Sequence, residues 1–144
     1  MTPPLVVVTG ASSGIGLAVA RAFARDGHPL LLVARHMKPV DGLATERTVY
    51  AEADVTDYPA LEAAVRGAEA RFGKTGCLVN NAGFADARPF SAVAAEDYAR
   101  EIDVNLKGVM NGTKAVLADM QAAGRGTIIN ISSVNGEKGQ AGQT

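Results

Sequence analysis

The sequence predicts an α/β protein with a doubly wound parallel sheet, arranged in three layers. Short apolar runs alternate along the chain with stretches whose apolar residues recur at helical spacing, and this alternation is typical of repeated βαβ units. The runs are apolar at consecutive positions, as strands covered by helices on both faces require. At 144 residues, with 47% hydrophobic and 20% charged residues, the chain has the size of one domain, expected over residues 1–144.

The strands are expected at residues 5–8, 29–34, 48–53, 76–80 and 127–132. Between the first two strands lies a helix that ends at Gly27, where the apolar pattern stops. Its apolar stripe consists of Ile15, Ala18, Val19, Ala22 and Phe23.

Two further helices connect the later strands. One begins at a capping residue, either Thr56 or Asp57, has Pro59 in its first turn and ends at Gly73. Its buried stripe consists of Leu61, Val65, Ala68 and Phe72. The other is a long helix over residues 95–123, with a buried face of Ile102, Leu106, Val109, Thr113, Val116 and Met120.

The turn after the first strand, Thr9-Gly10-Ala11-Ser12-Ser13-Gly14-Ile15-Gly16, suits a pyrophosphate group. Glycine has no Cβ and lets the backbone approach a ligand, while N–H groups at the positive end of the helix dipole face the anion. The G-x3-G-x-G spacing differs from the common G-x-G-x-x-G pattern, so an ordinary tight turn is the alternative. The turn predicts that the chain binds a dinucleotide.

Polar or glycine-bearing turns follow the other predicted strands as well. They are Arg35 after the second strand, Asp54-Val55 after the third, Asn80-Asn81-Ala82-Gly83 after the fourth and Ser132-Ser133 after the fifth. With right-handed crossovers, the strand order reverses between the first and fourth strands, and ligands bind beyond the carboxyl ends there. We therefore expect these turns to converge around one ligand.

Charge and composition argue against several other classes of partner. Fourteen basic and 15 acidic residues give a net charge of -1 without a basic stripe, so we expect neither nucleic-acid nor membrane binding. The single cysteine, Cys77, adjoins an apolar pair and is interpreted as a small buried hydrophobe. No charged leader precedes the first apolar run, which predicts a reducing, cytoplasmic location. His28 and His36 lack partners at metal-ligand spacing, so no metal site is expected.

Five motifs, in order and at matching intervals, resemble those of short-chain dehydrogenase/reductases, a family with a Rossmann-type fold. They are the glycine turn at residues 9–16, Asp54-Val55, Asn80-Asn81-Ala82-Gly83, Val104-Asn105 and Asn130-Ile131-Ser132-Ser133. The resemblance covers essentially the whole chain. It implies a nicotinamide cofactor bound by Gly10, Ser12, Ser13, Gly14, Ile15, Gly16, Arg35, Asp54, Val55, Asn81, Ala82, Gly83 and Val104.

The resemblance also implies individual roles. Asp54 would accept a hydrogen bond from the adenine amino group, whereas the alternative is a cap for the helix that begins near residue 57. Asn80 and Asn81 would tie neighbouring strand ends together beside the nicotinamide ribose. The alternative for Asn-Asn-Ala-Gly is an ordinary turn.

The end of the second strand favours NADP(H) over NAD(H). In this fold an acidic residue commonly binds the ribose 2′-OH of NAD, whereas a nearby Arg accommodates the 2′-phosphate of NADP. This chain has Ala34-Arg35-His36 there, with no carboxylate. Ser12 and Ser13 offer hydroxyl donors to the same phosphate, and a solvated Arg at a strand end is the alternative.

The implied chemistry is hydride transfer between the nicotinamide and a carbonyl or alcohol carbon, with proton transfer through a tyrosine phenol. Ser133 matches the family serine that hydrogen-bonds the substrate oxygen. Asn105 matches the family asparagine that holds a water in a proton relay. The alternatives are a polar strand end or helix cap at Ser133 and a structural buried amide at Asn105.

One part of the family pattern has no counterpart in this sequence. Relatives carry a Tyr-x-x-x-Lys pair after the active serine, at a spacing that places the tyrosine just beyond Thr144. Tyr50, Tyr58 and Tyr98 have no lysine four residues later. We therefore expect the chain to be part of a longer enzyme, with a sheet incomplete at the C-terminus and residues 136–144 forming a mobile loop.

The sequence is compatible with three functions. The first is an NAD(P)(H)-dependent oxidoreductase, NADPH favoured, that acts on a small carbonyl or alcohol. Residues 130–144 are similar to those of acetoacetyl-CoA and 3-oxoacyl thioester reductases, which adds 3-oxoacyl thioesters as a candidate substrate class. The alternatives are a non-catalytic nucleotide-binding module and a fragment that needs a partner chain to complete its fold. By analogy with relatives, a homo-oligomer, either dimer or tetramer, is expected.

Overall fold

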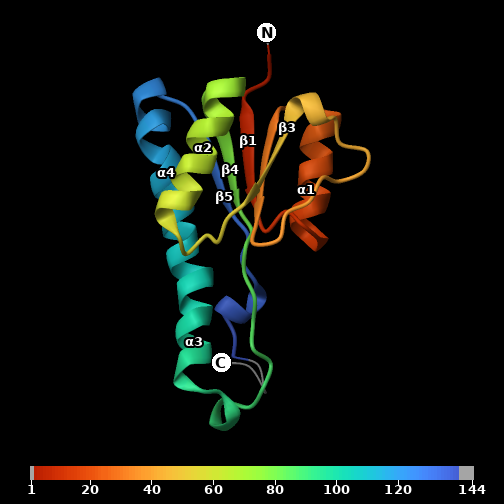
Figure 1. Cartoon of the computed structure of the whole chain (residues 1–144). Coiled ribbons are helices and arrows are strands. Elements are labelled where there is room, and N and C mark those ends of the chain that lie inside the picture. The colour runs from red at the N-terminus through yellow and green to blue at the C-terminus, as the bar shows by residue number, and fades with distance from the viewer. Residues whose placement is uncertain (1, 140–144) are drawn as a thin grey trace.

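A five-stranded parallel sheet with helices on both faces forms the centre of the computed structural model, which describes residues 2–139 (Figure 1). The strand order is β3-β2-β1-β4-β5, so the order reverses between β1 and β4 as predicted. The strands are β1 (Leu5–Thr9), β2 (Leu30–Ala34), β3 (Thr48–Glu52), β4 (Thr75–Asn80) and β5 (Thr127–Asn130). The helices are α1 (Gly14–Arg25), α2 (Tyr58–Phe72), α3 (Ala95–Ile102) and α4 (Gly108–Ala123). The predicted doubly wound α/β class is confirmed.

The central strands are buried on both faces because their alternate residues enter two separate cores. Leu5 and Val7 of β1 pack in the core that α2 and α4 cover. Val6 and Val8 of the same strand pack in the core beneath α1. Continuous apolar runs are therefore the pattern that this three-layer arrangement requires.

The strands begin and end within two residues of their predicted positions. The largest difference is in β5, which ends at Asn130 and not at residue 132. Asp57, one of the two predicted caps, begins α2: its carboxylate accepts a hydrogen bond from the Ala60 N–H at 3.1 Å. The predicted loop over 136–144 overlaps a 3-10 turn (Val134–Gly136), and its residues 140–144 lie outside the described residues.

The prediction of one regular helix over 95–123 was wrong in its middle. A π-helical turn, η3 (Asp103–Lys107), separates α3 from α4 and inserts an extra residue into the helical repeat. Ile102 and Leu106, predicted to be buried, are 52% and 57% exposed. Figure 1 shows why: α3 extends past the carboxyl ends of the strands, where no sheet covers it. Val116 and Met120, which lie over the sheet, are buried as predicted.

A buried carboxylate links α2 to the beginning of β4. Glu69 has a side chain that is only 4% exposed, and its Oε1 accepts hydrogen bonds from the N–H and the hydroxyl of Thr75 at 3.1 and 2.8 Å. Its Oε2 pairs with Arg66 at 2.6 Å and with Lys74 at 3.3 Å. Arg66 and Lys74 also pair with Asp119 of α4, so one network joins two helices and a strand.

Cys77 of β4 is buried, as predicted, and burial raises the pKa of its thiol. A raised pKa disfavours the reactive thiolate. None of the helices within residues 2–139 combines the length and the apolar character that a membrane crossing needs.

Candidate functional site

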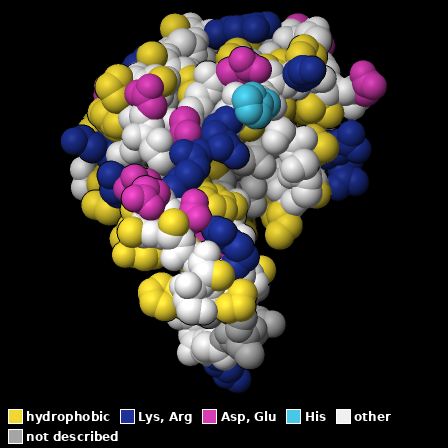
Figure 2. Space-filling view, turned by 60° about the horizontal axis from the view of Figure 1, so that its bottom comes forward, with side chains coloured by type: hydrophobic (Ala, Val, Ile, Leu, Met, Phe, Trp, Pro, Cys, Tyr) yellow, Lys and Arg dark blue, Asp and Glu magenta, His cyan; other side chains and the backbone are white. Residues whose placement is uncertain are grey.

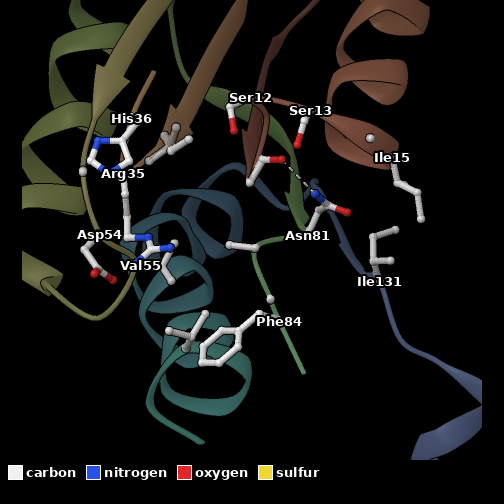
Figure 3. A pocket seen from close by; sticks show the side chains of 18 residues that line it. Ser12, Ser13, Ile15, Arg35, His36, Asp54, Val55, Asn81, Phe84 and Ile131 are labelled. Atoms are coloured by element: carbon white, nitrogen blue, oxygen red, sulfur yellow. Dashed lines mark hydrogen bonds between the residues drawn. The ribbon is translucent and has the colours of Figure 1, made fainter. Parts of the chain in front are cut away.

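A cavity of about 580 Å³ opens at the carboxyl edge of the sheet, where the turns after β1, β2, β3 and β4 converge (Figure 3). Val104 of η3 and Ile131 beyond β5 complete its wall. Every residue that the sequence predicts to bind a cofactor lines this cavity, with the exception of Gly16. The predicted convergence is therefore present for the turns after β1, β2, β3 and β4, whereas Ser132 and Ser133 after β5 do not line the cavity.

The glycine turn leaves open space at one position and forces close packing at another. Gly14 has φ +55°, and a Cβ added there would meet no atom within 4 Å, so its backbone borders free space. Gly16 lies behind the cavity, where a Cβ would come within 2.3 Å of the Gly10 carbonyl oxygen. Gly16 therefore permits α1 to pack against the turn, which explains why it does not reach the cavity wall.

The N-terminus of α1 presents its backbone to the cavity without a capping side chain. Ser13 precedes the helix in an extended conformation, and its hydroxyl makes no capping hydrogen bond. Ser12, Ser13, Gly14 and Ile15 all line the cavity. The first turn of a helix has N–H groups without intrahelical partners, so this end can accept an anion.

The ends of β1 and β4 are held together by the side chains of Asn81 and Thr9. Asn81 donates through Nδ2 to the carbonyl oxygens of Thr9 and Gly10, both at 3.1 Å. The Thr9 hydroxyl accepts from the N–H groups of Asn81 and Ala82, both at 3.0 Å. Asn80 reaches across to β5, where its Nδ2 donates to Asn130 at 2.9 Å. The predicted tying of neighbouring strand ends is confirmed.

Asp54 holds a fixed orientation after β3. Its Oδ1 accepts hydrogen bonds from the N–H and the hydroxyl of Thr56, at 3.0 and 2.8 Å. Although partial burial raises the pKa of Asp54, the bonds from Thr56 and the charges of Arg100 and Arg35 bring it below its ordinary value. The alternative role, a cap for α2, is wrong because Asp57 fills it.

The side chains of Arg35 and His36 follow the end of β2. Arg35 and His36 both line the cavity, and no carboxylate follows β2 at this point. In Figure 3 the Arg35 side chain extends toward Val55 and Asp54. From the sequence, His36 is considered only as a metal ligand, for which it lacks partners. Its position directly after Arg35 is the signal that could have assigned it to the cavity.

Asn105 and Ser133 do not line the cavity. Asn105 is exposed, which corrects the alternative of a buried amide, and its side chain pairs with the backbone of Phe84. Its Nδ2 donates to the Phe84 carbonyl oxygen at 2.6 Å and its Oδ1 accepts from the Phe84 N–H at 3.0 Å. The Ser133 hydroxyl accepts from the Asn135 N–H at 3.2 Å, which is the capping arrangement weighed as its alternative.

Sequence reasoning missed several cavity residues besides His36. They are Val33, Ala34, Ala53, Phe84 and Ile131. Four of them lie at or next to a predicted strand end, and Phe84 follows the turn after β4. Apolar side chains at such positions carry no chemical signal in a sequence. Within residues 2–139, no group of three or more His, Cys, Asp or Glu side chains could hold a metal ion.

Comparison with known proteins places this geometry in a family. Residues 4–144 match the family model described as short chain dehydrogenase. The oxidoreductase UcpA of Salmonella typhimurium is 40% identical over 143 residues, which cover 95% of this chain and 54% of the relative.

Solved structures agree with this match. The crystal structure of a short-chain dehydrogenase from Streptomyces avermitilis superposes with a TM-score of 0.90 at 31% identity, covering 97% of this chain and 54% of that one. The structure of ElxO with NADP bound superposes with a TM-score of 0.87 at 27% identity, covering 95% and 58%. The chain thus spans about half the length of the relatives it matches. Because the family match extends over nearly all of its residues, the chain belongs to the short-chain dehydrogenase family.

Proposed function

We propose that residues 1–144 form the dinucleotide-binding domain of an NADP(H)-dependent oxidoreductase that transfers hydride between the nicotinamide and a carbonyl or alcohol carbon. The observation that carries this proposal is the cavity at the carboxyl edge of the sheet, bordered by the glycine turn and by the uncapped N-terminus of α1. A phosphate-bearing ligand suits such a position because backbone N–H groups and the helix dipole favour negative charge there.

The residues present fit this cofactor. Gly14 leaves room for a pyrophosphate, since a Cβ there would meet no atom within 4 Å outside its own chain neighbours and helix backbone. Asn81, Ala82 and Gly83 would border the nicotinamide ribose, and Asp54, Val55 and Val104 the adenine. The bound nicotinamide supplies the hydride acceptor or donor, and this chain's residues bind and orient it.

Arg35 supports the choice of NADP(H) over NAD(H). Arg35 and the neighbouring His36 follow β2 and line the cavity, so we expect the ribose 2′-substituent near them, and no carboxylate at that strand end would repel a 2′-phosphate. The similarity to ElxO, whose structure contains NADP, is consistent with this choice.

For the chemical step, we assign Ser133 to hydrogen-bond the substrate oxygen and Asn105 to hold a water for proton transfer. Asn105 already joins η3 to the loop at Phe84, which lines the cavity, so it connects the helix to the cofactor site. Among the described residues no tyrosine lines the cavity, and the proposal therefore gives proton donation to none of them.

The substrate class and the assembly are part of the same proposal. The resemblance of residues 130–144 to 3-oxoacyl thioester reductases makes a 3-oxoacyl thioester the first substrate to test. Apolar side chains exposed on α4, including Met110 at 61% and Leu117 at 39%, support a homo-oligomer, dimer or tetramer. A cytoplasmic location is proposed from the single cysteine.

The test of the proposal is calorimetric titration of the chain with NADPH and with NADH. We expect NADPH to bind more tightly, and Arg35→Glu to weaken NADPH binding by about 2 kcal/mol, or roughly thirtyfold, while sparing NADH. Arg125→Glu, at the opposite edge of the sheet, is the charge-matched control. The proposal would be contradicted if the unaltered chain bound neither nucleotide, or if it bound NADPH and NADH with equal affinity.

The substrate is tested separately in the oxidoreductase that contains this domain, by following NADPH oxidation in the presence of acetoacetyl-CoA and of simple ketones. Consumption with the thioester is the expected result. Turnover of the ketones without turnover of the thioester would remove the thioester from the proposal and leave hydride transfer in place.

A further inference from the structure

The side chain of Arg100, on α3, lies near Asp54, one of the residues that line the cavity. Its Nη2 is 3.7 Å from Oδ2 of Asp54, which is too long for a hydrogen bond. Within residues 2–139 the Arg100 side chain has no other hydrogen-bond or ion-pair partner. Its N–H donors are therefore available to a ligand.

Only one of the two carboxylate oxygens of Asp54, Oδ2, is available to a ligand. Thr56 occupies Oδ1 with two hydrogen bonds, which fixes the plane of the carboxylate. Oδ2 faces Arg100, and its side chain is 28% exposed. A ligand that enters the cavity here meets a hydrogen-bond acceptor, Oδ2, and next to it a hydrogen-bond donor, the guanidinium.

Asp54, whose Oδ2 lies 3.7 Å from Nη2 of Arg100, is part of the cavity wall. Val104 lines the cavity together with Asp54 and Val55. The guanidinium therefore lies near the part of the cavity wall formed by Asp54, Val55 and Val104, and the two valines offer an apolar surface that suits a flat base.

An acceptor beside a donor complements the edge of adenine. The adenine 6-amino group donates a hydrogen bond, and the ring nitrogens on either side of it, N1 and N7, accept one. We infer that Arg100 is a specificity-determining residue that donates a hydrogen bond to a ring nitrogen of adenine while Asp54 accepts from the 6-amino group. This inference rests on the proposed binding of a nicotinamide adenine dinucleotide.

The test pairs a substitution in the protein with a substitution in the ligand. The ligands are NADPH and NADH, together with the 1-deaza and 7-deaza analogues of whichever binds more tightly. In each analogue a C–H group replaces one ring nitrogen of adenine. In the unaltered chain, one of the two analogues binds about tenfold more weakly than the natural nucleotide. Arg100→Gln lowers the affinity for the natural nucleotide by a similar factor and leaves the affinity for that analogue nearly unchanged.

Two control variants separate this interaction from general effects. Arg125→Gln removes the same charge at the opposite edge of the sheet and is expected to leave every affinity within about twofold. Arg100→Lys keeps a charge and a donor and is expected to retain part of the discrimination. Circular dichroism and the thermal midpoint of each variant verify that it folds.

Three results would overturn the inference, and they can be told apart. Additive losses from Arg100→Gln and from both deaza substitutions would overturn the inference, because the protein and ligand groups would then not interact. A loss that is confined to NADPH and absent with NADH would also overturn it, since Arg100 would then act on the 2′-phosphate. If the unaltered chain binds neither dinucleotide, the proposed function fails together with the inference.

Discussion

At the scale of single residues, Gly16 marks the closest approach between α1 and the turn after β1. A Cβ at this position would lie 2.3 Å from the Gly10 carbonyl oxygen and 2.5 Å from Asn81 Nδ2. Both neighbours are held by other bonds, because Asn81 donates to the carbonyls of Thr9 and Gly10. The surroundings therefore cannot yield without disturbing the strand ends.

We predict that Gly16→Ala lowers the free energy of unfolding by about 1–3 kcal/mol, the usual cost of overpacking. Gly67→Ala is the matched control: Gly67 lies in α2, and a Cβ there would meet nothing within 4 Å. That variant is expected to stabilise the chain by about 0.5–1 kcal/mol through helix propensity. Urea denaturation measures both, and equal effects of the two substitutions would contradict the packing assigned to Gly16.

Asp54 links the site to acid stability. Its pKa in the folded chain is lowered, so its carboxylate stabilises the fold at any pH above the pKa in the unfolded chain. This contribution is lost as the pH falls through the folded pKa, in the window below about pH 4. We predict that Asp54→Asn, measured by urea unfolding, is less stable than the unaltered chain near neutral pH. The difference should shrink toward acid, and a constant difference would show that the charge of Asp54 does not matter.

At the scale of elements, the buried carboxylate of Glu69 joins α2 to β4. Removing it leaves the buried N–H and hydroxyl of Thr75 without their acceptor and removes the ion pairs that Glu69 makes with Arg66 and Lys74. We predict that Glu69→Ala lowers the free energy of unfolding by about 2 kcal/mol, since an unpaired buried donor costs about 1–3 kcal/mol.

The control for Glu69 is Glu62→Ala on the same helix, where the carboxylate accepts from the Tyr58 hydroxyl at 2.9 Å. Because this contact is nearer to solvent, a loss of about 0.5 kcal/mol or less is expected. Urea denaturation of both variants measures the two losses in the free energy of unfolding. A loss at Glu62 as large as that at Glu69 would mean that burial of the Glu69 network is not what stabilises the junction.

Elements differ in how well the sequence predicts them. The central strands were predictable because residues that are buried on both faces must be apolar at successive positions, as in Leu5–Thr9. The interruption between α3 and α4 was not, because a π-helical turn changes the hydrogen-bond register without changing the kind of residue. Apolar spacing alone therefore placed Ile102 and Leu106 in the core, whereas they lie beyond the end of the sheet.

At the scale of the whole molecule, the cavity was predictable because strand order and crossover hand bring the carboxyl-end turns together. Residues with a chemical signal, such as Asp54 and Arg35, could be assigned to it in advance. Contacts between distant segments could not, because the approach of Arg100 to Asp54 depends on how α3 lies against the turn after β3.

The space-filling view in Figure 2 shows Lys and Arg side chains interspersed with Asp and Glu on the visible face, together with a hollow near its centre. The mixture agrees with the small net charge of -1. A ligand is therefore expected to be selected by the local groups of the cavity and not by a broad field of one sign.

The central claim is that the cavity at the carboxyl edge of the sheet binds a nicotinamide dinucleotide. The most direct measurement is the change in backbone amide chemical shifts of the isotope-labelled chain during titration with NADPH. The account predicts the largest changes at Ser13, Gly14, Arg35, Val55 and Ala82, which come from four separate turns of the cavity wall. Changes confined to the opposite edge of the sheet, around Lys74 and Arg125, or no change at all, would contradict it.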